Sequence, residues 1–134
     1  MNTYIKSLIE FLDSSVCNFC AVETVKNQLN ANGYKELKFS DSWTLEKNGK
    51  YYVTRNQSGV LAFVLPENVD ALSFHMVASH SDSPTFKVKE SAQMTVEEKY
   101  VKLNTEKYGG MILSTWLDRP LSVAGRVVIK DEDG

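Results

Sequence analysis

The sequence of 134 residues predicts an α/β fold, with an α/β pattern over roughly the first 90 residues and a β-rich pattern over the last 40. Three observations predict it. Apolar residues recur at helical spacing near the N-terminus, tight-turn signals separate short apolar runs in the middle, and alternating segments with glycine and proline breaks follow. A chain of this length normally forms one domain.

Two helices are predicted first. Residues 4–12, YIKSLIEFL, place apolar side chains at positions 5, 8, 9 and 12, which is the spacing of an amphipathic helix. A second helix fits residues 21–31, with Val22, Val25 and Leu29 on one face and Gly33 as its stop signal.

A β-hairpin is predicted next. Asn48-Gly49 and Gln57-Ser58-Gly59 are turn signals that flank two apolar runs. The expected strands are residues 50–55 and 60–65.

Further strands are expected at residues 72–80, the best candidate for a buried strand, and at residues 123–129, with a bend at Gly125. The last strand is followed directly by Asp-Glu-Asp-Gly, a turn that ought to lead into a partner strand. We therefore expect that the sequence has been cut at this point.

Composition excludes some classes of function. A net charge of -2 and a pI of about 5.7 argue against electrostatic binding to nucleic acid or to an anionic membrane. The apolar stretch 59–65 is far too short to span a membrane. Glu10 and Asp13 interrupt the apolar N-terminal pattern, which does not fit a signal peptide. We expect a cytoplasmic protein.

Cys17 and Cys20 form a single C-x-x-C motif between the two predicted helices. A structural zinc site needs a second pair of ligands, and a thioredoxin-type motif should follow a strand. The expectation is a reduced, metal-free pair packed at a helix junction, and a redox or metal role is the alternative.

His80 and Asp82 form the most informative short pattern. On an extended backbone, residues two apart face the same side, so both would point into a cleft at the end of the predicted strand. A zinc-binding histidine needs its second ring nitrogen held, and Asp82 supplies a carboxylate for that. The alternative is an exposed polar pair. His75 would face the other side as a structural histidine.

A zinc hydrolase needs about three ligands per metal ion and a carboxylate that takes a proton from water. The sequence shows no further histidine or paired glutamate in a suitable place. Glu97-Glu98 lies in a charged stretch typical of solvated surface.

Several blocks, in order along the chain, resemble the aspartyl aminopeptidase family of dinuclear zinc peptidases. The blocks are FLDSS (11–15), SWTLEKNGKYYVTRNQSGVLAF (42–63), ASHSDSPTFKVK (78–89) and YGGMILSTWLDRPLSVAGRVVIK (108–130). The family often has Pro-Phe-His after the first helix, where this chain reads Cys17-Asn18-Phe19-Cys20, and an acidic residue after Asp118-Arg119, where this chain has Pro120.

The resemblance implies that His80 is a zinc ligand and Asp82 the catalytic aspartate that orients it. It also implies two zinc ions in the intact enzyme, with the remaining ligands and the glutamate base beyond residue 134. Residues 1–93 would be the start of the catalytic domain, and residues 94–134 the first strands of an inserted oligomerisation domain.

Two segments gain a second interpretation. Gly109-Gly110 is read as a bend entering a strand rather than as a phosphate-binding turn. Trp116, Asp118 and Arg119 lie either near the cleft or a subunit contact, or simply form a packed tryptophan with a local salt bridge.

The leading hypothesis is the N-terminal segment of a zinc aminopeptidase that acts on a peptide substrate, with an acidic N-terminal residue as one option, and that forms homo-oligomers. Alone, the chain is expected to be inactive. The alternatives are a non-enzymatic truncated fragment and another co-catalytic zinc hydrolase of the same fold.

Overall fold

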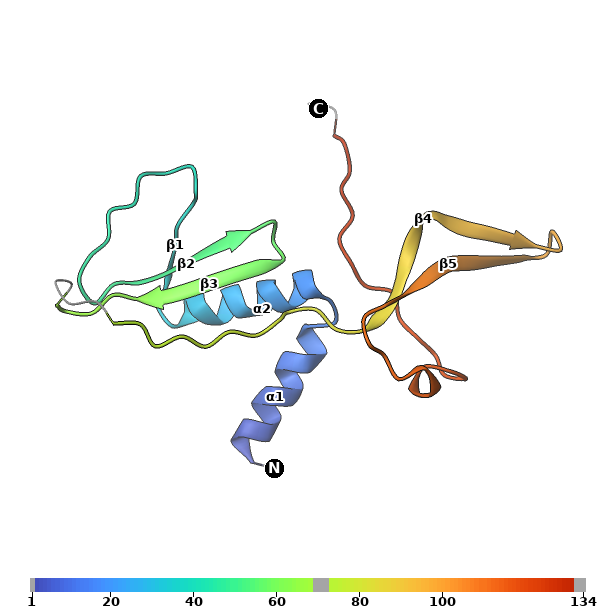
Figure 1. Ribbon diagram of the computed structural model, residues 1–134, viewed down its shortest axis with the longest axis horizontal. Coiled ribbons are helices and arrows are strands. Elements are labelled where there is room, and N and C mark those ends of the chain that lie inside the picture. The colour runs from blue at the N-terminus through green and yellow to red at the C-terminus, as the bar shows by residue number, and fades with distance from the viewer. Residues whose placement is uncertain (1, 69–72, 132–134) are drawn as a thin grey trace. The chain divides into compact units, whose positions relative to one another are not determined.

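The computed structural model describes residues 2–68 and 73–131 (Figure 1). The chain forms two compact units, and each is described by itself. The first unit contains the chain up to Ser81 and again from Ala124, and the second unit contains Asp82–Val123.

The first unit begins with helix α1, Thr3–Ser14, and helix α2, Asn18–Ala31. The side chain of Asn2 caps α1 by accepting a hydrogen bond from the Tyr4 backbone N–H at 3.0 Å. At the C-terminal end of α2, Gly33 adopts a positive φ of 78°, and Tyr34 N–H donates to the Leu29 carbonyl. This is a Schellman ending, which glycine favours. Both predicted helices are confirmed.

The same unit contains a three-stranded sheet in the order β1-β2-β3, formed by Lys35–Glu36, Lys50–Arg55 and Gly59–Val64. β1 is parallel to β2, and β2 is antiparallel to β3. Asn56 and Gln57 connect the hairpin with φ angles of 51° and 57°, a turn whose twist suits paired strands. The predicted hairpin is confirmed, with its second strand starting one residue earlier.

The buried side chains of the first unit come from α2 and from β2. Among the described residues, the buried apolar side chains are Val22, Tyr51, Tyr52 and Val53. The Tyr52 hydroxyl donates to Asn30 Oδ1 at 3.0 Å, so this buried side chain also satisfies its polar end. In contrast, α1 leaves its apolar face exposed, for example Leu8 at 57%. Neither described helix has the length and apolar content to span a membrane.

The second unit is a two-stranded antiparallel ribbon, β4 (Thr85–Val96) and β5 (Tyr100–Tyr108), followed by the short 3-10 helix η1 (Leu113–Thr115). A bulge interrupts the pairing between Val88 and Gln93. Glu97 and Glu98 make the connecting turn with positive φ angles and are exposed, as predicted for surface residues.

Two predicted strands are wrong. Residues 73–80 and 123–129 form neither helix nor strand, and residue 72 lies outside the described residues. Both runs have strand composition, but a strand also requires a hydrogen-bonded neighbour, and no described strand pairs with either run. Their apolar side chains are accordingly exposed, with Val77 at 102% and Val127 at 84%.

The bend at Gly109 was predicted to enter a strand. In the structure it directly follows the end of β5 at Tyr108. The φ of Gly109 is 76°, and a Cβ at this position would lie 3.3 Å from Pro84 Cα. Both the backbone angle and the close approach require glycine here.

The predicted boundary between residues 93 and 94 falls within β4, whereas the compact units divide at Ser81 and Val123. The assignment of residues 1–93 to a catalytic domain and of 94–134 to an insert stays a prediction.

Candidate functional site

His80 is exposed and lies in an irregular segment, residues 73–80, that forms neither helix nor strand. The next residue anchors this segment to the hairpin, because Ser81 Oγ donates to the Ser58 carbonyl at 3.0 Å. His80 therefore does not end a strand as predicted. It lies in a segment held beside the β2–β3 turn of the first unit. His75 is exposed in the same segment, not on the face of a buried strand.

Asp82 is half-buried and begins the second unit. One of its carboxylate oxygens, Oδ2, accepts a hydrogen bond of 2.5 Å from the Tyr108 hydroxyl. The boundary between the units falls between Ser81 and Asp82, so each predicted site residue is described within its own unit. The predicted pairing of His80 with Asp82 stays a prediction.

The β4–β5 register explains why Tyr108 reaches Asp82. Thr85, the first residue of β4, pairs with Tyr108, the last residue of β5. Asp82 lies three residues before Thr85, and a Cβ added to Gly109 would lie 3.3 Å from the intervening Pro84 Cα. A hairpin thus brings together two residues that are 26 positions apart in the sequence.

The contact changes the chemistry of the tyrosine. The hydrogen bond to Asp82, followed by the negative charge of that carboxylate and by burial, raises the pKa of Tyr108 above its ordinary value. At neutral pH the hydroxyl therefore keeps its proton and donates to Asp82. A charge-assisted bond of this kind fixes the orientation of the carboxylate.

Tyr108 is not among the site residues predicted from the sequence. Its only signal was its place at the start of the YGG block, because the contact depends on a hairpin register that no local pattern shows.

The fit to zinc is incomplete in this part of the protein. Across residues 2–68 and 73–131, no three His, Cys, Asp or Glu side chains gather closely enough to hold a metal ion. These residues do not form a zinc site by themselves. The roles of His80 as a ligand and of Asp82 as an orienting carboxylate stay predictions.

The other candidate residues have structural contacts. Trp116 packs edge-on against Phe86 with 5.6 Å between ring centroids, as an ordinary packed tryptophan would. Arg119 donates to the Thr115 carbonyl at 3.3 Å, and Asp118 adopts a positive φ of 52°. Cys17 and Cys20 are free cysteines at the junction of α1 and α2, the location predicted for them.

Comparison with known proteins assigns the family. The family model described as aminopeptidase I zinc metalloprotease (M18) matches residues 11–134. The chain belongs to the M18 family. This match includes the segment with His80 and Asp82 and extends through the ribbon that carries Tyr108.

Curated relatives agree with the family assignment. A probable M18 family aminopeptidase 2 of Clostridium novyi is 47% identical over 131 residues, which are 97% of this chain and 30% of that protein. Aspartyl aminopeptidase 4 of Saccharomyces cerevisiae is 40% identical over 135 residues, covering 96% of this chain and 26% of that protein. The chain therefore spans less than a third of the length of these relatives.

Solved structures share the fold. The cryo-EM structure of the Ape4 and Nbr1 complex matches with a TM-score of 0.91 and 34% identity, over 96% of this chain and 25% of that one. The mApe1 dodecamer of S. cerevisiae matches with a TM-score of 0.74 and 25% identity, over 87% and 28%. The α/β fold class predicted from the sequence is confirmed.

Proposed function

We propose that this chain is the N-terminal segment of a zinc-dependent aminopeptidase that hydrolyses the N-terminal residue of a peptide substrate. The observation that carries the proposal is the M18 family match across residues 11–134, because it includes the His80-Ser81-Asp82 block. The same match disfavours a different co-catalytic zinc hydrolase of this fold.

His80 is proposed as a zinc ligand. Its imidazole supplies ring nitrogens, the donor that zinc commonly takes from histidine in proteins. Two zinc ions are proposed for the complete site, with the other ligands coming from the part of the relatives' length that this chain does not span.

Asp82 is proposed as the catalytic aspartate that orients the site, and Tyr108 as the residue that positions Asp82. The hydroxyl of Tyr108 donates to Oδ2 of the carboxylate and restrains its orientation. An oriented carboxylate loses less conformational freedom when it engages its partner.

Two finer proposals rest on the relatives. The name of the S. cerevisiae aspartyl aminopeptidase supports an acidic N-terminal residue as the preferred substrate. The dodecamer found for S. cerevisiae mApe1 supports a homo-oligomer. A cytoplasmic location is proposed from the sequence alone.

The test is release of free amino acid from peptides that begin with Asp, Glu, Ala or Leu, with zinc supplied. It compares the 134-residue chain with a form of the length of the relatives. The longer form should release Asp and Glu preferentially, and the short chain should release none. Robust zinc-dependent release by the short chain contradicts the proposal.

A non-catalytic role for the chain on its own is the second candidate. It is favoured by the lack of a three-ligand cluster among the described residues. Absence of peptidase activity in the longer form, with zinc bound, would support it over the enzyme.

A further inference from the structure

Cys17 and Cys20, which form the C-x-x-C pair, lie at the junction between α1 and α2. Cys17 is the N-cap residue of α2, with an extended backbone, and its carbonyl accepts the first helical hydrogen bond from Ala21 N–H at 2.8 Å. Cys20 occupies the first turn of the same helix. Both residues are partly exposed.

The two sulfurs are close. Cys17 Sγ and Cys20 Sγ are 2.8 Å apart, which is about 0.8 Å beyond the length of a disulfide bond of about 2.05 Å. The two thiols are therefore within reach of each other, and closing the bond requires the sulfurs to approach by about 0.8 Å.

The surroundings of the two sulfurs differ. Cys17 Sγ accepts a hydrogen bond from Cys20 backbone N–H at 3.3 Å, at the positive end of the α2 dipole, which stabilises negative charge on that sulfur. The hydrogen bond to Cys17, followed by burial, raises the pKa of Cys20. Cys17 is therefore the sulfur suited to attack, and Cys20 the sulfur that keeps its proton until the second step.

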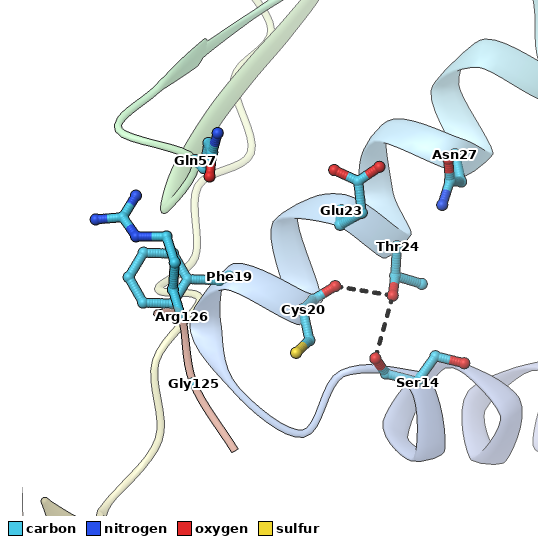
Figure 2. Close-up of a pocket in the computed structure, with 9 residues that line it drawn as sticks. All are labelled: Ser14, Phe19, Cys20, Glu23, Thr24, Asn27, Gln57, Gly125 and Arg126. Carbon is cyan, nitrogen blue, oxygen red and sulfur yellow. Dashed lines mark hydrogen bonds between the residues drawn. The ribbon is translucent and has the colours of Figure 1, made fainter. Parts of the chain in front are cut away.

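A hollow of about 420 Å³ in the first unit opens beside Cys20, and it is lined by residues that include Phe19, Glu23 and Arg126. Figure 2 shows Cys20 on α2 between Phe19 and Thr24, with Arg126 lying over the Phe19 ring. The guanidinium carbon is 4.4 Å from the ring centroid, and Arg126 Nη1 donates to the Asn56 carbonyl at 2.9 Å. The hollow thus reaches one member of the pair, Cys20.

We propose that Cys17 and Cys20 form a reversible thiol–disulfide exchange site whose co-substrate is a low-molecular-weight disulfide, RSSR. The Cys17 thiolate attacks one sulfur of RSSR, forming Cys17–S–S–R and releasing RS⁻. Cys20 loses its proton and attacks the Cys17 sulfur, which releases the second RS⁻ and forms the Cys17–Cys20 bond. The protein loses two electrons and two protons, and RSSR becomes two RSH.

A bond between these cysteines suits a reversible role. A disulfide stabilises a fold more when it closes a longer loop, and this one encloses only two residues. The fold does not depend on it, because the N-cap and the core contacts are formed with free thiols. In a reducing compartment the resting state is the dithiol, in accord with the expectation from the sequence.

The experiment uses the intact protein that carries this chain, with glutathione disulfide as the probe. Trypsin cleaves after Lys6 and Lys26, so peptide 7–26 contains both cysteines and reports on them alone. In the wild-type protein this peptide should lose two hydrogens, and dithiothreitol should restore them. Two glutathione adducts on the peptide, with no internal disulfide, would overturn the proposal.

Two variants test the order of attack. Cys20→Ser should accumulate one glutathione on Cys17, because the second step is blocked. Cys17→Ser, which keeps a good N-cap residue, should react at least about 10-fold more slowly than Cys20→Ser. Equal rates, or a faster Cys17→Ser, would overturn the assignment of Cys17 as the attacking thiolate.

The same two variants unfolded in urea are the matched control. Their rates should converge, because the helix dipole and the N–H donor are lost on unfolding. A rate difference that persists in urea would show that local sequence, and not the fold of the α1–α2 junction, causes it.

Discussion

The two compact units of this chain are built in different ways. The first unit buries side chains of α2 and β2, and Tyr52 is only 1% exposed. The second is a ribbon whose strands are solvated on both faces, with Tyr100 at 62% and Leu103 at 54%. Among the described residues, every buried apolar side chain belongs to the first unit. The first unit is thus held together by packing and the second by its backbone ladder and its turns.

The largest effect should follow from Tyr52→Ala in the first unit. Loss of a nearly fully buried aromatic ring and of its hydrogen bond to Asn30 should lower the free energy of unfolding by about 3–5 kcal/mol. Urea denaturation monitored by circular dichroism measures this change.

Tyr100→Ala in β5 is the matched control, because the same side chain is removed from an exposed position. It should change the free energy of unfolding by no more than about 0.5 kcal/mol. Equal losses for the two variants would show that the contrast between the units is wrong.

A smaller effect is expected from the turn that closes the second unit. Gly109→Ala puts a Cβ at a φ of 76° and 3.3 Å from Pro84 Cα, which should cost about 1–2 kcal/mol. Amide hydrogen exchange in β4 and β5 should then be about 5- to 30-fold faster. Gly110→Ala, where nothing lies within 4 Å of an added Cβ, should leave exchange unchanged. Similar exchange in both variants would contradict this role of Gly109.

The smallest effect concerns the contact between Tyr108 and Asp82. Since the pKa of Tyr108 is raised, the contact stabilises the folded chain below the ordinary tyrosine pKa of about 10 and is lost as pH rises through the higher folded value. The ultraviolet absorbance of the wild type and of Tyr108→Phe is titrated with pH. The difference between the two curves reports the ionisation of Tyr108 alone.

Asp82→Asn removes the charge and should return the Tyr108 titration toward its ordinary range. Titration of Tyr108 together with the other tyrosines, and unchanged by Asp82→Asn, would show that the hydrogen bond does not form in solution.

The same contrast explains what the sequence could predict. The helices and the hairpin were predicted because their signals are local: apolar spacing, a glycine stop and paired turns. The strands at 72–80 and 123–129 were not, since composition cannot show whether a hydrogen-bonded neighbour exists. Likewise, His80 and Asp82 were found as a short motif, whereas Tyr108 was missed because it reaches Asp82 only through the register of a hairpin.

The most direct test of the central claim, that His80 and Asp82 serve a zinc aminopeptidase, measures zinc content and peptidase rate together. Both are measured in the protein of the length of the relatives, as wild type, His80→Ala and Asp82→Asn. His80→Ala should lower zinc content and rate together. Asp82→Asn should lower the rate on an Asp-leading peptide by about 10- to 100-fold and retain most of the zinc. Full zinc content and full rate in His80→Ala would contradict the account.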